Sequence, residues 1–221
     1  MDINLEIQNF PFWDKLNETE KRMMINGATY RKYDKNQMVY GYSDACLGII
    51  YVKKGGIRVY TTSEDGREVT FFHIEEGDFC ILSASCVIGQ MMIDVQLLAD
   101  EETELLAIHS GTFAQVMDNN IYVKAFAFEL STTRMTSVVW VMQQILFDHF
   151  DERLARFLLS VYEKTGEKKI KMTQEYMAQE VNSAREVVAR MLKQFASDGW
   201  IEINRGAITL KDIEALENLV K

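Results

Sequence analysis

Residues suited to holding metals or disulfides are scarce in this sequence, which has three cysteines and three histidines among 221 residues. Cys46, Cys80 and Cys86 are odd in number and lack the C-x-x-C spacing typical of zinc sites. We therefore expect neither a disulfide framework nor a zinc site. The histidines lie far apart, without the i, i+4 spacing of a metal-binding cluster. The sequence thus predicts no resident metal.

Long apolar runs are absent as well. No run reaches the roughly 20 residues that a membrane-spanning helix needs. The first residues, MDINLEIQNFPFWDKL, have neither the basic start nor the apolar centre of a signal peptide. We therefore expect a cytoplasmic protein that has no membrane partner.

Positive charge is in deficit, because 24 Lys and Arg against 33 Asp and Glu give a net charge of −9. The deficit is uneven. From Lys168 to Gly206 seven basic residues stand against five acidic ones, a balance of +2 that leaves −11 for the rest of the chain. Since phosphate attraction needs only a local basic face, this asymmetry favours a nucleic-acid-binding part joined to an acidic part.

Residues 172–193, MTQEYMAQEVNSAREVVARMLK, have the pattern of two helices joined by a tight turn. Thr173 is a suitable N-cap for the first helix, which would bury Met177 and Val181 one turn apart. Asn182 then stands where the chain must turn, and Asn tolerates a left-handed backbone better than most residues. The pattern predicts a helix-turn-helix.

The second helix should begin at once, because Ser183 and Glu186 match the S-x-x-E capping box. At about 100° per residue its apolar face holds Val188, Met191, Leu192 and Phe195, and its opposite face holds Arg185, Glu186, Ala189, Arg190 and Lys193. Arg can donate two hydrogen bonds to guanine, and Glu can accept one from the cytosine amino group. We interpret this as a DNA-recognition helix; the alternative is an ordinary amphipathic helix with a solvated charged face.

A short hairpin is predicted directly after this helix. Asp198-Gly199 ends the helix, and residues 200–203 and 207–210 alternate as two strands around the turn Asn204-Arg205-Gly206. A hairpin in this place is a wing, and Arg205 at its tip would contact a phosphate. The prediction becomes a winged helix-turn-helix.

Residues 30–110 read as all-β. The expected strands are residues 48–52, 57–61, 69–74 and 104–108, with turns at 54–56, 64–66 and 76–78. Turn signals every eleven residues or so, between strands that alternate apolar and polar residues, favour a sandwich or barrel over a parallel sheet.

A long helix should follow, since residues 121–146 contain no Gly or Pro and their apolar residues recur in heptads. The expected dimer seam consists of Ile121, Ala125, Phe128, Thr132, Met135, Val139, Met142 and Leu146. The alternative is a helix buried against its own domain, because Phe126, Val138, Trp140, Val141 and Ile145 add apolar surface off the seam. Residues 147–150 break the pattern, which suggests a hinge, and residues 151–163 form a further helix.

These features, in this order, resemble the Crp/Fnr family of bacterial transcription regulators over nearly the whole chain from about residue 28. The most specific matches are VKKGG at 52–56, EDGRE at 64–68, EEGDF at 75–79 and NSAREVVARMLKQF at 182–195. The resemblance implies an α+β fold. Its parts would be an N-terminal double-stranded β-helix (a jelly roll like a cyclic-nucleotide-binding domain) at 1–118, a long dimerisation helix at 119–147 and a winged helix-turn-helix domain at 151–221.

The resemblance also implies a homodimer on double-stranded DNA with a palindromic operator, and RNA polymerase as a further partner. In the family an Arg-Glu-x-x-x-Arg set reads the major groove, and Arg185, Glu186 and Arg190 stand at those positions. The full set of expected DNA contacts is Thr173, Gln174, Ser183, Arg185, Glu186, Arg190 and Arg205.

One departure from the family concerns cyclic AMP. Members that bind it follow the GDF turn with a Gly-Glu pair and later an Arg-Ser or Arg-Thr pair. Here Ile81 and Leu82 replace Gly-Glu, and residues 79–99 contain no Lys or Arg. Burying a phosphate without a cation would be costly, so we expect no cyclic nucleotide. If a cation came from elsewhere, Arg58 and Arg67 are the candidates.

The same segment is where the family places its effector, so the expected effector pocket comprises Cys80, Ile81, Leu82, Ser83 and Cys86. The two cysteines, spaced C-x5-C with little charge nearby, are open to two interpretations. They are either buried thiols that act as small hydrophobes, or a thiol sensor or ligand to haem or another soft metal. The sequence does not identify the cofactor or effector.

We therefore expect a homodimeric, sequence-specific DNA-binding regulator, not an enzyme, controlled by an unknown small effector in the β-roll. The alternative is a regulatory module that uses the β-roll and dimer helix to bind protein instead of DNA. Arg185, Glu186, Arg190 and the wing argue against that alternative. A cupin-type enzyme is more distant, because clustered His and Glu ligands are absent from the sequence.

Overall fold

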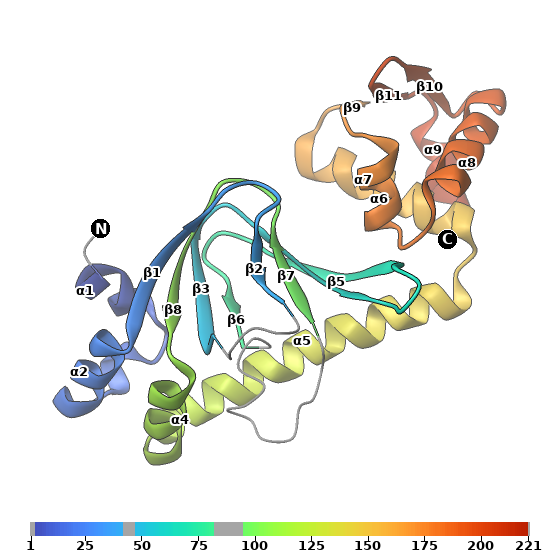
Figure 1. Ribbon diagram of the computed structural model, residues 1–221. Helices are drawn as coiled ribbons and strands as arrows, with labels where there is room; N and C mark the ends of the chain where they lie inside the picture. The colour runs from blue at the N-terminus through green and yellow to red at the C-terminus, as the bar shows by residue number, and fades with distance from the viewer. Residues whose placement is uncertain (1–2, 42–46, 82–94, 221) are drawn as a thin grey trace. The chain divides into compact units, whose positions relative to one another are not determined.

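The computed structural model of the chain describes residues 3–41, 47–81 and 95–220. The chain forms two compact units, the N-terminal unit (Met1–Arg67 with Phe71–Val139) and the C-terminal unit (Glu68–Thr70 with Trp140–Lys221). Figure 1 shows the elements of both.

The N-terminal unit is built on two antiparallel four-stranded sheets. The first sheet has the order β1 (Ala28–Tyr33), β8 (Thr103–Ile108), β3 (Ile49–Lys54) and β6 (Phe79–Cys80), and the second β2 (Met38–Tyr40), β7 (Gln96–Ala99), β4 (Ile57–Thr62) and β5 (Glu68–Ile74). Apolar side chains from both sheets, including Ile50, Val59, Leu97 and Leu105, are fully buried in one core. This arrangement confirms the predicted jelly roll.

The four strands predicted from sequence are present as β3, β4, β5 and β8, each within two residues of the expected bounds. The structure adds β1, β2, β6 and β7. Three of these are only two to four residues long, and in β1 a single residue, Tyr33, is buried. Alternation of apolar residues was therefore too weak to reveal them. Their pairing depends on neighbours that are distant in sequence.

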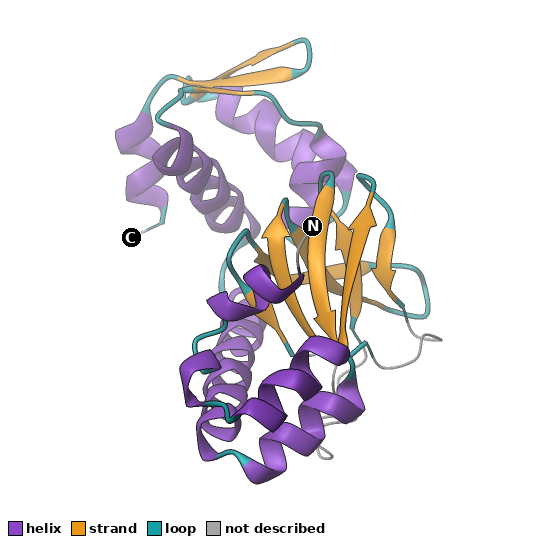
Figure 2. Cartoon of the chain, turned by 90° about the vertical axis from the view of Figure 1, so that its left-hand side faces the viewer, coloured by secondary structure: helices purple, strands orange, loops and turns teal. Residues whose placement is uncertain are grey.

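Short helices close one end of this unit (Figure 2). They are α1 (Ile3–Glu6), the 3-10 turns η1 (Ile7–Asn9) and η2 (Trp13–Lys15), α2 (Glu18–Asn26) and α4 (Ser110–Asn119). Helix α2 begins with a capping box between Asn17 and Glu20, and Asn120 donates to the Glu20 carboxylate over 3.0 Å. The side chain of Asn120 also accepts from the backbone of Tyr122 and Val123, where the next helix starts.

That next helix, α5 (Ile121–Phe147), is continuous over 27 residues, as the absence of Gly and Pro predicts. It ends at Phe147, and α6 begins at Phe150, so the predicted break at residues 147–150 is confirmed. An aromatic cluster packs on its first turns. The rings of Phe12 and Phe79 contact Phe126 of α5, with centroid distances of 5.1 and 5.2 Å, and Phe10 packs on Phe79.

Besides the first residues of β5 and the end of α5, the C-terminal unit contains four helices and a small sheet. Its elements are α6 (Phe150–Thr165), β9 (Lys169–Ile170), α7 (Gln174–Glu180), α8 (Arg185–Ser197), β10 (Ile201–Asn204), β11 (Ala207–Leu210) and α9 (Ile213–Leu219). The sheet has the order β10-β11-β9. Its core contains Leu158, Met177, Val188, Leu192 and Phe195, all at most 2% exposed. Strand β9 was not predicted, because it is two residues long.

Candidate DNA-reading face and effector segment

The turn between α7 and α8 is set by Asn182, which has a φ of 52°. Thr173 caps the start of α7, where its side-chain oxygen accepts from the backbone N–H of Tyr176 over 3.1 Å. At the other end, Asn182 N–H donates to Gln179 and Ser183 N–H donates to Ala178 over 2.9 Å. These two bonds and the left-handed residue between them are a Schellman ending. The predicted N-cap and turn are confirmed.

The predicted capping box of Ser183 and Glu186 is wrong. Helix α8 begins at Arg185, its N-cap is the extended residue Ala184, and no side chain caps it. The physical reason is the Schellman ending, which uses the backbone of Ser183 to close α7 and delays the new helix by one residue. Glu186 consequently stands in the first turn of α8, where a carboxylate interacts favourably with the helix dipole.

Helix α8 separates its apolar and charged residues as predicted. Val188, Leu192 and Phe195 are buried, and Met191 packs partly buried against the same core. Arg185, Glu186, Arg190 and Lys193 are exposed on the opposite face. Within the part of the chain that the structure describes, no carboxylate forms an ion pair with either arginine. The charged face is therefore available for a ligand.

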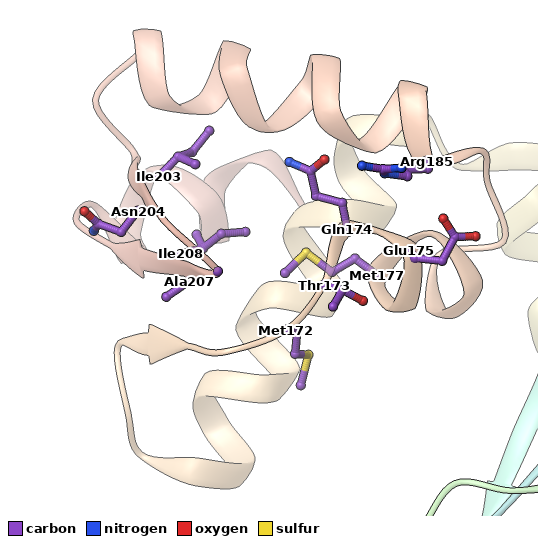
Figure 3. Close-up of a pocket in the computed structure, with 11 residues that line it drawn as sticks. Met172, Thr173, Gln174, Glu175, Met177, Arg185, Ile203, Asn204, Ala207 and Ile208 are labelled. Carbon is purple, nitrogen blue, oxygen red and sulfur yellow. The ribbon is translucent and has the colours of Figure 1, made fainter. Parts of the chain in front are cut away.

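A groove of about 270 Å³ lies between the start of α7, the start of α8 and the wing. Arg185 and Gln174 border one part of it, and Ile203 and Asn204 of the wing border another (Figure 3). Its remaining lining is Met172, Thr173, Glu175, Met177, Gly206, Ala207 and Ile208. The groove thus brings together three of the predicted DNA contacts: Thr173, Gln174 and Arg185.

The wing is a hairpin in which Ile201 pairs opposite Leu210 and Asn204 opposite Ala207. This register leaves Arg205 and Gly206 as a two-residue turn, and Gly206 has a φ of 72°, which glycine adopts readily. Arg205 is exposed at the turn. Glu202 on β10 pairs with Lys211 over 2.6 Å, and this ammonium lowers the pKa of the Glu202 carboxyl.

Helix α5 carries two stripes. Val123 and Ala127 are buried in the core of the N-terminal unit, and Ser131 and Val138 continue the same buried stripe. The eight residues of the predicted seam are all exposed, Ile121 by 69% and Leu146 by 68%. At about 100° per residue the two stripes lie about a third of a turn apart. One face of this helix is therefore covered within the chain, and the face of the predicted seam is open in the single chain.

The effector segment is described only in part. Cys80 and Ile81 are fully buried, whereas Leu82, Ser83 and Cys86 lie outside the described residues. Of the two cations named from sequence, Arg58 is 2% exposed and its guanidinium lies 4.1 Å from the ring centroid of Tyr60. No group of three or more metal-binding side chains occurs in residues 3–41, 47–81 and 95–220.

Sequence reasoning missed Arg134, which α5 brings to the start of this segment. Its side chain is 11% exposed and donates to the carbonyl oxygen of Phe79 over 2.8 Å. It also lies 3.5 Å from the Asp78 carboxylate and 5.0 Å from the ring centroid of Phe72. Its Nε is buried and has no hydrogen-bond partner among the described residues. The available signal was a lone arginine in a long, mostly apolar helix.

The comparisons with known proteins agree with this architecture. The family model of the cyclic nucleotide-binding domain matches residues 30–120, and that of the Crp-like helix-turn-helix domain matches residues 152–219. A crystal structure from Eubacterium rectale, described as a transcriptional regulator of the Crp/Fnr family, is 32% identical, with a TM-score of 0.90. The match covers 96% of this chain and 99% of that one.

Two further relatives are more distant. The cyclic AMP receptor protein of Thermus thermophilus is 19% identical over 209 residues, 95% of this chain and 96% of the relative. The cAMP-activated global transcriptional regulator Vfr of Pseudomonas aeruginosa is 20% identical over 189 residues, 78% of this chain and 85% of the relative. The chain belongs to the Crp/Fnr family of transcription regulators, as a DNA-binding regulator with an effector domain.

Among the described residues, no helix combines the length and the apolar character that crossing a membrane requires.

Proposed function

We propose that this chain is a homodimeric transcription regulator whose helix α8 reads a palindromic operator in the major groove. The observation that carries the proposal is the exposure of Arg185, Glu186 and Arg190 on a helix whose other face is buried. Arg185 also borders the groove that leads to the wing. Arginine recognises guanine through two hydrogen bonds, and a carboxylate accepts from cytosine, so these residues suit base reading.

The remaining predicted contacts suit the DNA backbone. Thr173 and Gln174 line the groove at the start of α7, and Ser183 lies in the turn before α8. Arg205 is exposed at the wing turn, where a cation would neutralise one phosphate. In this division of roles α8 specifies the sequence, and the wing and turn residues fix the register on the duplex.

We propose that two copies associate through the open stripe of α5. Six large apolar side chains of the predicted seam are each at least 42% exposed in the single chain: Ile121, Phe128, Met135, Val139, Met142 and Leu146. Their heptad spacing fits a second helix of the same kind. Two-fold symmetry would present two copies of α8 to two half-sites, which is what a palindromic operator requires.

We propose that the effector is not a cyclic nucleotide, although two relatives are named for cyclic AMP. The support is the sequence of residues 79–99, which has Ile81-Leu82 in place of Gly-Glu and no basic residue. Calorimetry with cyclic AMP and cyclic GMP should give no dissociation constant below the micromolar range. Sub-micromolar binding would contradict the proposal and would require a cation from outside residues 79–99, with Arg58 and Arg67 as the candidates.

We propose that the protein acts in the cytoplasm, with RNA polymerase as a partner.

DNA binding is tested with random genomic fragments in a gel shift at rising salt, followed by selection of bound sequences from a randomised duplex. We expect the protein to shift the DNA band, less strongly as the salt concentration rises, and the selected binding site to have two-fold symmetry. Absence of binding at low salt would favour the protein-binding module instead.

A further inference from the structure

Three exposed lysines lie on β9 and directly beside it. Lys168, Lys169 and Lys171 are exposed, whereas Ile170 between them is buried in the core of the C-terminal unit. Lys169 pairs opposite Thr209, and the backbone N–H of Leu210 donates to the carbonyl of Lys168 over 2.9 Å. The backbone under the lysines is therefore held by β11 and does not move as a free loop.

The lysines are continuous with the DNA-reading face in two ways. Along the chain, Lys171 is followed by Met172 and Thr173, which line the groove beside Arg185. Across the sheet, β9 neighbours β11, whose Ala207 and Ile208 line the same groove. Figure 3 shows the chain passing from the β9 arrow through Met172 to Thr173 at the start of α7.

The two edges of this small sheet differ in net charge. On the β10 edge, Glu202 is neutralised by Lys211. On the β9 edge, residues 167–173 contain three lysines and one acid, Glu167, and within the described chain none of these lysines forms an ion pair. Lysines on an edge strand also prevent edge-to-edge pairing of sheets, which is the competing explanation for their presence.

We propose that Lys168, Lys169 and Lys171 form a second line of DNA-backbone contacts, beside the contact that Arg205 makes from the wing. The inference rests on the proposed function and extends its binding surface to an edge that no motif predicted. A lysine ammonium binds a phosphate as a point charge, so these contacts add affinity without adding sequence preference. Each also makes the affinity more sensitive to salt.

The test compares two double variants of the full chain on a random-sequence duplex of about 40 base pairs, by fluorescence anisotropy across a salt series. Lys169→Gln/Lys171→Gln removes two charges from the β9 edge. Lys35→Gln/Lys54→Gln removes the same charge from exposed sites in the N-terminal unit that lie outside α5. Thermal unfolding checks that neither pair alters folding. Glutamine keeps a polar side chain of similar length, so the edge strand is preserved.

We expect the β9 variant to bind several-fold more weakly, because fewer phosphates are neutralised. Its plot of log affinity against log salt should flatten by about one unit for each phosphate that is no longer bound. The control should stay close to the wild type. Equal affinities and slopes for the β9 variant and the wild type would overturn the inference and leave edge protection as the role of the lysines. If the wild type itself bound no DNA, the proposed function would fail instead, and the two failures are thus distinct.

Discussion

Helices α5 and α8 each have one buried face and one face in solvent, yet their open faces have opposite chemistry. The open face of α8 carries Arg185, Glu186 and Arg190. The open stripe of α5 carries large apolar side chains, Phe128 and Met135 among them, exposed by 55% and 48%. The buried faces resemble each other, and the open faces differ in what they can bind.

This difference matters because the two faces contribute to the free energy of binding in different ways. An exposed charged side chain is already well solvated, so it gains only where a partner offers matching charges or base edges. Burial of an exposed apolar stripe is favourable wherever the stripe leaves water, and a second copy of the helix offers apolar residues at the same heptad spacing. Charge on α8 therefore indicates DNA, and apolar surface on α5 indicates self-association.

The largest effect should come from placing charge on the open stripe of α5. In Phe128→Lys/Met135→Lys, like charges from two copies would meet in a dry interface, and we expect the dimer to become a monomer at micromolar concentration. Sedimentation velocity measures this directly. Thr133→Lys adds charge at an exposed position outside the seam and should leave the dimer intact. A dimer that survives the double substitution would show that the seam lies elsewhere.

Substitutions on α8 and the wing should have smaller effects that differ in kind. Arg185→Ala should cost roughly 1–3 kcal/mol of binding and relax the preference at one base pair, because the guanidinium no longer reads a base edge. Arg205→Ala should weaken all sequences alike and flatten the salt slope by about one unit. Binding-site selection with both variants separates the roles. Indistinguishable selected sites would show that α8 is not the reader.

The buried face of α5 can be tested without touching the open one. Arg134→Met removes the bond to the Phe79 carbonyl and the contact with Asp78, and should lower the stability of the N-terminal unit by roughly 1–3 kcal/mol. Thermal unfolding of the full chain measures this, and sedimentation should still show a dimer. Arg134→Lys serves as the control that keeps the charge. An unchanged melting temperature in Arg134→Met would mean that the contact contributes little.

The elements predicted correctly from the sequence are those whose boundaries are determined by residues close to them in the chain. Thr173 caps α7, Asn182 makes the turn, and Gly206 permits the wing turn, so each boundary depends on residues within one turn of it. The heptads of α5 are equally local, because spacing along one helix decides which residues share a face. These signals located most of the candidate DNA-reading face before any tertiary contact was considered.

What the sequence could not predict depends on packing between distant segments. Strand β1 is defined by its pairing with β8, some 75 residues away, and β9 by its pairing with β11. The position of Arg134 beside Phe79 requires α5 to lie across the β-roll, a contact that spans 55 residues. Even the start of α8 was displaced by one residue, because the ending of α7 used the backbone of Ser183.

The smallest expected effects are on stability, and they come from substitutions at the starts of α7 and α8. Thr173→Ala removes a side-chain oxygen that accepts from Tyr176 N–H, and should lower the free energy of unfolding by about 1 kcal/mol. Ser183→Ala should change it by less than about 0.5 kcal/mol, since no side chain caps α8. Urea unfolding followed by tryptophan fluorescence measures both, in a Trp13→Phe/Trp140→Phe background that leaves Trp200 of this unit as the reporter. Equal decreases would mean that the Ser183 hydroxyl does cap α8 in solution, and that the helix begins where the capping box places it.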